Sequence, residues 1–390
     1  MKSNYKRLGD YIRSVDVRNK DLAIDRLLGV SITKTFIESI ANTVGTDFSN
    51  YKVVKKNQFA YGPVTSRNGD KISVALLSED ECIISSSYSV FEINDENQLL
   101  PDYLMLWFNR PEFDRYARYM SHGSVREIFS WDDMCDVELP VPSIDEQHEI
   151  VAAYKAIENR IALKKKINDN LVQSGISIIQ KEVGFAALIN KTQAEIDNIV
   201  LPDGWMIKSI AEYCADTKSG STPSRNESDY WENGTIPWLK SGEVHNNITL
   251  YTEEAITPTA VKETSVKLLP PNTVLMAMYG VTAGEVGYLA ISATTNQAIC
   301  GMVCNSKPES AYLYFALIQN QEEASRLSNG GAQDNLSKSF IDGINLVVPD
   351  LQSINSFHLD SIVSQITLNT KEINTLEELK SIVLATMSSR

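Results

Sequence analysis

The chain has 390 residues, of which 43% are hydrophobic and 22% are charged, and its formal net charge is −14. This length predicts two or three domains, and no apolar run reaches the roughly 18 residues needed to cross a bilayer. The acidic charge argues against a stand-alone, non-specific nucleic-acid binder, because neutralisation of phosphates supplies most of the affinity of such proteins.

The first half of the chain mixes short β-rich runs with one helical pattern. Residues 71–77 (KISVALL) and 81–93 (ECIISSSYSVFEI) are rich in β-branched residues and predict strands. Residues 102–120 (DYLMLWFNRPEFDRYARYM) predict a helix that lies on the resulting sheet. We therefore expect a globular domain over residues 1–143.

A long helix is predicted to follow this domain, over residues 144–190. The stretch LPVPSIDEQHEIV (139–151) contains the capping box Ser143-x-x-Glu146, whose two side chains satisfy free N–H groups at the helix start. Beyond this cap, residues recur in alternating steps of four and three, which is heptad spacing with polar interruptions. The apolar members of the series are Ile150, Tyr154, Ile157, Ile161, Leu171 and Ile178.

The second half repeats this plan, with a globular domain expected over residues 191–351. Residues 218–238 are polar and rich in glycine, serine and proline, which predicts a long loop. Residues 273–280 and 297–304 predict strands, and residues 311–328 (AYLYFALIQNQEEASRLS) predict a helix.

A second long helix is predicted over residues 352–390. The stretch LVVPDLQSINSFHL (346–359) is a degenerate copy of the first connector, with Asp350 in place of the capping serine. The heptad spacing that follows it runs through Leu359, Ile362, Ile366, Asn369, Ile373, Leu376, Lys380 and Val383.

An internal repeat joins these two halves. Pro349 follows Pro142 by 207 positions, and at nearly the same offset Tyr103 meets Tyr312 and Ser85–Val90 meets Thr294–Ile299. The two connector helices could pack separately on their own domains, but their narrow apolar seams favour packing on each other. The predicted fold is thus of the mixed α/β (α+β) class, with two homologous globular domains separated by two long helices.

The sequence contains no convincing catalytic motif. It has no phosphate-binding Gly-x-x-x-x-Gly-Lys loop, no dinucleotide fingerprint, no paired zinc-binding histidines, no Asn-Pro-Pro-Tyr turn and no nuclease carboxylate set. The motif Ser31-x-x-Lys34 is short and lacks its companion motifs. Five scattered cysteines argue against disulfides and metal sites, so we expect a cytoplasmic protein. Because catalytic motifs are absent from the sequence, we expect it to bind rather than to catalyse.

The residues repeated between the domains are short hydrogen-bonding side chains, with arginine, lysine, asparagine and glutamine around them. These side chains suit purine edges and phosphates, although each one alone could equally be a solvated loop residue. The candidate DNA-contacting residues of the first domain are Lys34, Arg67, Asn68, Ser87, Tyr88, His122, Ser124 and Arg126. Those of the second domain are Lys218, Gly220, Thr222, Lys240, Tyr279, Thr282, Asn296, Gln297, Asn335 and Lys338.

These features together resemble the specificity (S) subunits of type I restriction–modification systems. The resemblance is found in the LPVPSIDEQHEIV connector, in residues 201–244 (LPDGWMIKSI…WLKSGEV) and in the TTNQAI run (294–299) after MYGVTAGEVG. LLGVSITKTFI and FAYGPVTSRNGDKISVALL in the first half resemble a second variety of the same domain. The second connector departs from the family, since SINSFHL lacks the Glu-Gln pair of the first.

The resemblance implies two target recognition domains, each of which reads one half of a split double-stranded DNA target. The two helices would form an antiparallel coiled coil that docks two methyltransferase (M) subunits, which hold S-adenosylmethionine, while restriction (R) subunits use ATP and Mg. This chain itself would hold no cofactor or metal and would not be an enzyme. The residues expected to bind the M subunits are Gln147, Ile150, Tyr154, Ile157, Ile362, Ile366 and Ile373.

Three other functions remain compatible with the residues. The chain could be the specificity chain of a related two-subunit restriction enzyme, or a coiled-coil adaptor that does not bind DNA. It could also be an enzyme with a non-obvious site at Ser31 and Lys34.

Overall fold

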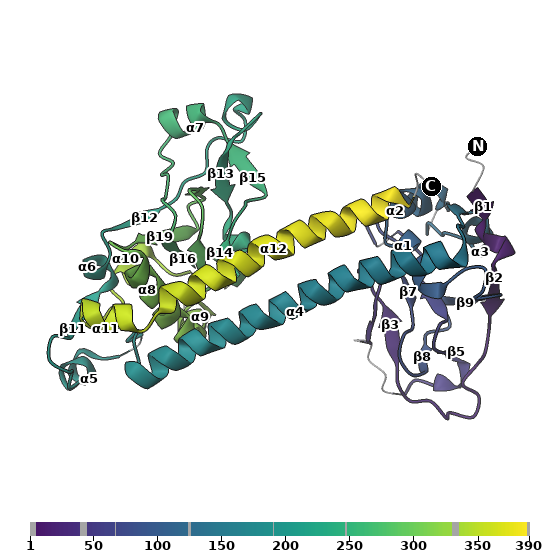
Figure 1. Cartoon of the computed structure of the whole chain (residues 1–390), viewed down its shortest axis with the longest axis horizontal. Helices are drawn as coiled ribbons and strands as arrows, with labels where there is room; N and C mark the ends of the chain where they lie inside the picture. The colour runs from purple at the N-terminus through teal and green to yellow at the C-terminus, as the bar shows by residue number, and fades with distance from the viewer. Residues whose placement is uncertain are drawn as a thin grey trace. The chain divides into compact units, whose positions relative to one another are not determined.

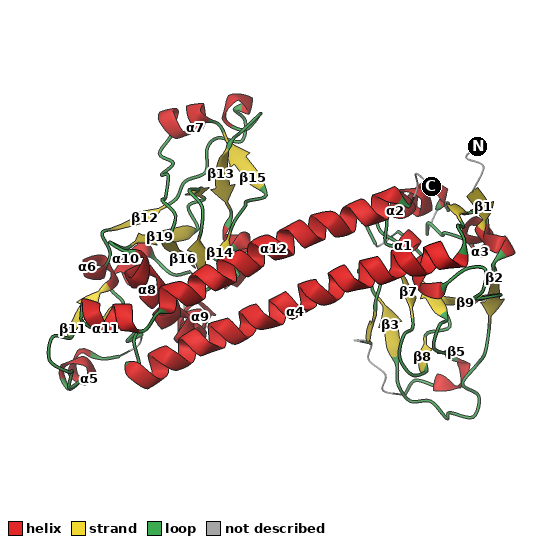
Figure 2. Ribbon diagram, viewed as in Figure 1, coloured by secondary structure: helices red, strands yellow, loops and turns green. Residues whose placement is uncertain are grey.

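The computed structural model of the chain describes residues 5–39, 45–66, 68–123, 126–189, 191–245, 248–329 and 335–387 (Figures 1 and 2). It divides into two compact units, Met1–Ile161 with Leu376–Arg390 (unit 1) and Ala162–Thr375 (unit 2). Each unit holds one globular domain together with parts of two long helices.

Unit 1 is built on a four-stranded antiparallel sheet in the order β2-β9-β6-β7. The strands predicted over 71–77 and 81–93 are present, although a turn at residues 85–88 divides the second of them. The sheet consists of β2 (Ile12–Val15), β9 (Ser89–Ile93), β6 (Phe59–Tyr61) and β7 (Val74–Leu76). Smaller antiparallel pairs join β1 (Tyr5–Arg7) to β10 (Glu138–Pro140), β3 (Leu28–Val30) to β4 (Phe36–Glu38), and β5 (Lys52–Val54) to β8 (Cys82–Ile84).

The helix predicted over residues 102–120 is two helices, α1 (Pro101–Phe108) and α2 (Pro111–Met120). Pro111 causes the break, because a proline disfavours helical geometry in the residue before it and is well suited to the first turn of a new helix. The core forms where α1 meets the sheet, and there the ring of Phe108 lies edge-on to Phe59, 5.8 Å between centroids. A short helix α3 (Trp131–Cys135) precedes β10.

Unit 2 has a five-stranded sheet in the order β12-β19-β16-β17-β14, antiparallel except for the parallel pair β14–β17. These strands are β12 (Asp216–Ser219), β19 (Ile299–Val303), β16 (Thr273–Ala277), β17 (Val286–Leu289) and β14 (Ile248–Thr249). A second sheet has the order β15-β13-β18, from β15 (Glu254–Ile256), β13 (Ile236–Leu239) and β18 (Thr294–Thr295). The strands predicted over 273–280 and 297–304 are confirmed as β16 and β19.

The helices of unit 2 differ from the prediction at one point. The helix predicted over 311–328 is divided at Asn320 into α8 (Lys307–Gln319) and α9 (Gln321–Asn329), and the buried Asn320 side chain donates to the carbonyl of Ala316 at 3.2 Å. The remaining elements are α5 (Gln193–Asp197), β11 (Met206–Ser209), α6 (Ile210–Tyr213), α7 (Pro258–Glu263), α10 (Lys338–Asp342) and β20 (Asn345–Val348). Residues 218–238 are mostly loop, as predicted.

The predicted repeat is confirmed by the topology of the two units. The strand order β2-β9-β6-β7 of unit 1 matches β12-β19-β16-β17 of unit 2, and in each unit the first strand pairs with the last, β1 with β10 and β11 with β20. Equivalent tyrosines make equivalent bonds, since Tyr103 donates to the carbonyl of Pro140 at 3.0 Å and Tyr312 donates to that of Val347.

The first connector is a continuous helix, α4 (Ile144–Glu182). The predicted capping box is confirmed, because Ser143 N–H donates to Glu146 at 3.2 Å and Glu146 N–H donates to the Ser143 hydroxyl at 3.4 Å. The helix ends before residue 190, where it was expected to end, because Gly184 adopts φ +83° and its N–H turns back to the carbonyl of Ile179.

The second connector is not the single helix that was predicted. It consists of α11 (Leu351–Ser356), capped by Asp350 as expected, and α12 (Leu359–Thr386). The two helices are separated by His358, whose φ of +52° is incompatible with a continuous helix. Within the described ranges, no helix is both long and apolar enough to cross a membrane.

The two long helices pair with each other antiparallel in both units, as predicted (Figure 2). In unit 1 the Lys380 ammonium lies 4.0 Å from Glu158 and 5.9 Å from the ring centroid of Tyr154. In unit 2 Lys164 forms an ion pair with Glu372 at 2.8 Å, and the buried Asn369 donates to Asn168 at 2.8 Å. A buried polar layer of this kind fixes the register of a helix pair.

Candidate nucleic-acid interface

In unit 2 several predicted residues meet around the turn between β18 and β19. Asn296 holds this turn, because its backbone N–H donates to the carbonyl of Leu239 at 2.9 Å and its side-chain oxygen accepts from Ala298 N–H at 3.1 Å. Such a side-chain-to-backbone bond fixes the shape of a turn. Asn296 therefore has a structural role, which places the exposed side chain of Gln297 beside it.

The loop after β12 passes over this turn at Gly220. A Cβ atom at Gly220 would lie 2.2 Å from the carbonyl oxygen of Thr295, so only glycine permits the approach. The loop is held there by Ser221 N–H, which donates to the same carbonyl at 2.9 Å. As a result the exposed Thr222 hydroxyl donates to the side-chain oxygen of Gln297 at 2.5 Å, and the Gln297 amide is held in one orientation.

The segment that follows β16 completes the cluster. Tyr279, which is 39% exposed, forms an isolated β-bridge with the exposed Asn335. Thr282, by contrast, is buried, and its hydroxyl donates to the carbonyl of Ser241 at 3.3 Å. Thr282 is therefore part of the support of the loop, which corrects its assignment as a contact residue.

The predicted lysines of unit 2 are compensated by carboxylates. Lys240 pairs with Glu253 at 2.6 Å and Glu254 at 3.2 Å, and these hydrogen bonds raise its pKa. Lys218 pairs with Asp216 at 3.0 Å. Lys338 pairs with Asp342 of the same helix, α10, at 2.5 Å, so the positive charge of these lysines is partly neutralised.

The sequence interpretation missed an arginine that organises the loop before β13. The Arg225 guanidinium lies 3.7 Å from the ring centroid of Trp231 and 4.9 Å from that of Trp238, and it pairs with Glu254. Both indoles are fixed, since Trp238 donates to the carbonyl of Ser221 at 3.0 Å and Trp231 to a carbonyl of the same loop. The arginine and two tryptophans within an otherwise polar loop were the available signal.

In unit 1 a similar loop crossing brings three predicted residues together. His122 bridges Ile128, and Ile128 also bridges Val64 on the loop after β6. That loop is closed by the Asn68 amide, which donates to the carbonyl of Val64 at 3.4 Å. His122 and Arg126 are exposed on the crossing segment. Arg67 and Ser124, also predicted here, lie outside the described residues.

Ser87 and Tyr88 lie at the turn before β9, the counterpart of the turn in unit 2. Ser87 is exposed, and its hydroxyl lies 3.0 Å from that of Ser85. Tyr88 is half-buried beside Gly62, with its hydroxyl 3.5 Å from Val30 N–H, so its ring packs against the start of the loop after β6.

Lys34 does not belong to this surface. It is buried, and its ammonium forms an ion pair with Asp114 at 2.9 Å and donates to the carbonyl of Phe108. Burial lowers the pKa of Lys34, an effect that Asp114 opposes. The Ser31 hydroxyl is instead directed at Thr33 and Thr35, so this geometry does not support the serine–lysine enzyme that the sequence left open.

The residues predicted to bind partner subunits face the interior of this chain. Gln147 is fully buried, where it accepts from Leu100 N–H and donates to the carbonyls of Gln98 and Pro142, each at 2.9 Å. Tyr154, Ile366 and Ile373 are buried, and Ile150, Ile157 and Ile362 are half-buried. Exposed apolar residues of α4 and α12 that were not among those predicted are Leu379 and Ile382 in unit 1, and Leu163 and Leu368 in unit 2.

The chain is similar over most of its length to proteins of one kind. It is 22% identical over 400 residues to the type I restriction enzyme HindI specificity subunit of Haemophilus influenzae, covering 85% of this chain and 86% of that protein. It is 21% identical over 294 residues to the MjaIX specificity subunit of Methanocaldococcus jannaschii, covering 73% and 68%. The S subunit of a type I system from M. genitalium shares the fold, with a TM-score of 0.57 at 13% identity over 98% of this chain and 95% of that one.

The family comparison agrees with the internal repeat. The model of the type I restriction modification DNA specificity domain matches the chain twice, over residues 10–173 and 202–378. These two matches contain the corresponding sheets of units 1 and 2. The chain therefore belongs to the family of type I restriction–modification DNA specificity proteins.

Proposed function

We propose that this chain is the DNA-specificity subunit of a type I restriction–modification complex and that each unit reads one half of a bipartite target. The observation that carries this proposal is the repetition of one domain, with the same sheet order, within a single chain of this family. Two similar reading surfaces suit a target that consists of two separate sequences.

The reading surfaces are the loop crossings described above. In unit 2 the Thr222 hydroxyl occupies the oxygen of the Gln297 amide, so Gln297 presents its two N–H donors. N–H donors match the N7 and O6 acceptors of purines in the major groove. In unit 1 the corresponding candidates are Asn68, His122 and Arg126.

The reactions would take place in partner subunits. Methyltransferase subunits would supply S-adenosylmethionine, and restriction subunits would supply ATP and Mg, all in the cytoplasm. The repeat supports two methyltransferase subunits, because a duplicated surface offers two equivalent docking sites. These subunits would also contact the DNA backbone, which accounts for a net charge of −14 on the chain that reads the sequence.

The proposal is tested by exchanging residues 191–351 for the second domain of another specificity subunit. With the methyltransferase subunits present, sequencing of methylated adenines should show a change in one half of the target only. A change in both halves would contradict independent reading. Transfer of labelled methyl groups to DNA by the isolated chain would contradict the assignment of catalysis to the partners.

Loss of the Gln297 amide should weaken specific binding alone. We expect Gln297→Ala to cost about 1–3 kcal/mol for the cognate site and little for unrelated DNA, because phosphate contacts remain. Competition binding at fixed salt, with the methyltransferase subunits present, measures both values. The matched control is Asn305→Ala, an exposed residue beyond the other end of β19. Equal losses on both DNAs would assign Gln297 a structural role.

The exposed apolar side chains of α12 should bind a methyltransferase subunit. Leu379 is 44% exposed and Ile382 is 58% exposed, so replacing both with glutamate should leave the free energy of unfolding nearly unchanged. Affinity for the methyltransferase subunit should fall at least about tenfold, since a charge at an apolar contact remains unpaired. Ile32→Glu, at an equally exposed residue of unit 1, is the control. Unchanged assembly of the double variant on size-exclusion chromatography would contradict this docking face.

A further inference from the structure

In unit 2 the last strand of the domain has a neighbour on both edges. β20 pairs with β11 on one edge, and on the other edge the extended residues 186–188 lie antiparallel to it. Leu188 N–H donates to the carbonyl of Asn345, and Val347 N–H donates to that of Ala186, both at 2.8 Å. The segment that follows α4 therefore forms a third strand of this small sheet.

This third strand is fastened by a side chain at the junction of two helices. Gln319, the last residue of α8, donates its side-chain N–H to the carbonyl of Gly184 at 2.8 Å. Its side-chain oxygen also accepts from Ala186 N–H at 3.5 Å.

In unit 1 the repeat places Arg110 where unit 2 has Gln319, at the junction of α1 and α2. Arg110 is only 4% exposed, and its buried Nε has no hydrogen-bond partner among the described residues. A buried donor without an acceptor is costly, so this position favours a ligand that supplies a carbonyl group.

The outer edge of β10 is open in the part of the chain that the structure describes. At this edge the Tyr103 hydroxyl donates to the carbonyl of Pro140 at 3.0 Å. By the repeat, Glu138 corresponds to Asn345, so its carbonyl corresponds to the one that accepts from Leu188 N–H. Pro140 corresponds to Val347 but has no N–H group. An added strand would thus gain one backbone bond fewer than in unit 2.

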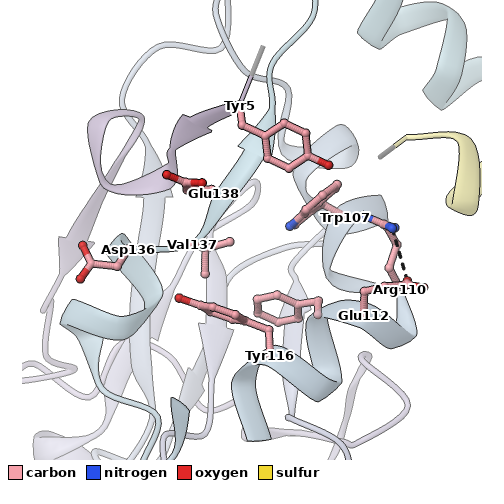
Figure 3. Close-up of a pocket in the computed structure, with 9 residues that line it drawn as sticks. Tyr5, Trp107, Arg110, Glu112, Tyr116, Asp136, Val137 and Glu138 are labelled. Carbon is pink, nitrogen blue, oxygen red and sulfur yellow. Dashed lines mark ion pairs between the residues drawn. The ribbon is translucent and has the colours of Figure 1, made fainter. Parts of the chain in front are cut away.

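A cavity of about 550 Å³ lies beside this edge. Figure 3 shows the rings of Tyr5 and Tyr116 on opposite sides of it, with Trp107 between them. The carboxylates of Asp136 and Glu138 lie across from Trp107, and Glu112 lies beside Arg110 on the Trp107 side. Arg110 stacks 4.3 Å from the Trp107 ring centroid.

The charge of the cavity points to a basic occupant. Glu112 pairs with Arg110 at 3.4 Å, and Asp136 pairs with Arg7 at 2.8 Å. Glu138 is exposed and has no ion pair among the residues that the structure describes. A residue that takes the place of Leu188 would lie directly opposite Glu138, where opposite charges on neighbouring strands attract.

We propose that this edge and cavity bind an extended segment of a second protein chain. The segment adds to β10 as an antiparallel strand, places a backbone carbonyl on Nε of Arg110, and places a lysine or arginine opposite Glu138. Strand addition of this kind gains affinity from backbone bonds and specificity from side-chain pockets. The site is separate from the loop crossings proposed to read DNA.

The test uses dye-labelled peptides that copy residues 184–189, with acetylated and amidated ends, and fluorescence anisotropy with the full chain. One peptide carries Leu188→Arg and the other carries Leu188→Glu. We expect the arginine peptide to bind about tenfold more tightly at low salt, and the difference to shrink as salt is added. Glu138→Lys in the protein should reverse this order. Glu149→Lys, the same charge change at an exposed site on α4, should not.

A second pair of variants tests the bond from Arg110. Arg110→Gln should keep binding, because Gln319 makes the equivalent bond in unit 2, whereas Arg110→Met should lose it. Glu138→Lys alters only an exposed side chain, so it still tests whether a basic segment binds at β10 even if Arg110→Met does not fold. Equal affinity of the two peptides, no binding, or no effect of Glu138→Lys would overturn the proposal. Binding that requires deletion of residues 388–390 would identify the chain's own end as the occupant and would also overturn it.

Discussion

A matched insertion of four residues in each long helix should lengthen the spacer of the DNA target by one to two base pairs. The insertions belong between residues 161 and 162 of α4 and between residues 375 and 376 of α12. These points face each other, because Glu158 meets Lys380 on one side of them and Lys164 meets Glu372 on the other. Four residues add about 6 Å and advance the helix by about 40° beyond a full turn. One base pair adds about 3.4 Å and roughly 35°.

The position of the insertion follows from the polar layer of unit 2. An insertion beside Lys164 or Thr370 would separate Lys164 from Asn369, whose side-chain oxygen it contacts at 3.0 Å, and would expose a buried amide. Insertion at the points given above leaves the contacts of Lys164 with Glu372 and Asn369 intact, and also that of Glu158 with Lys380. Sequencing of methylated adenines should show both half-sites unchanged and the spacer lengthened. Insertion in α4 alone is the control, and it should abolish activity because the helices lose register. An unchanged spacer with full activity would show that the helices do not set the distance.

The connector was predictable because its signals are local. Ser143 and Glu146 are three residues apart, and the bonds between them depend only on the first helical turn. The repeat was equally visible, because it copies whole segments, and the shared strand order follows from it. Pro111 was also a local signal, but the helical pattern on both sides of it obscured the break between α1 and α2.

The break at His358 could not be predicted in this way. The sequence there has neither glycine nor proline, and the positive φ of the exposed His358 marks a turn between the buried Ile354 and Leu359 that no local pattern indicates. Asn320 is similar, since its helix-ending conformation depends on burial of its side chain among the residues of unit 2. The break at Asn320 thus depends on burial, which a local sequence pattern does not show.

The candidate site residues also divide into those that a local pattern identifies and those whose exposure depends on distant segments. The repeat drew attention to the turn at Asn296 and Gln297, because it aligns with residues 87 and 88 of unit 1. In the structure Thr222 does contact Gln297, and Asn296 holds the same turn. Exposure, however, is set by segments far apart in the chain. Gln147 is covered by residues near position 100, which no local pattern could show. The acidic net charge agrees with the structure, since Lys240 and Lys338 of unit 2 are matched by carboxylates.

Loss of the Asp114 carboxylate, which forms an ion pair with the buried Lys34, should destabilise unit 1 more than any surface change. The side chains of Lys34 and Asp114 are 6% and 13% exposed, and Asp114 also accepts from Ile72 N–H at 3.2 Å. Asp114→Ala leaves a buried ammonium without its counter-charge, and we expect it to lower the free energy of unfolding by roughly 3–5 kcal/mol. Arg115→Ala is the matched control on the same helix, because Arg115 is 68% exposed, and it should change little. Urea unfolding followed by tryptophan fluorescence measures both variants.

The pH dependence of this loss identifies its cause. Burial already lowers the pKa of Lys34 below 10.5, so the unfolded chain binds more protons between the lowered pKa and 10.5. Stability contributed by this group therefore rises with pH in that window and is constant below it. Asp114→Ala removes the group that opposes the shift, so the window should extend to lower pH and the variant should recover stability as the pH is raised. Adding Lys34→Met to Asp114→Ala should recover most of the loss at neutral pH, because no buried charge remains. A double variant as unstable as Asp114→Ala would show that the loss comes from packing or from the Ile72 bond rather than from the unpaired charge.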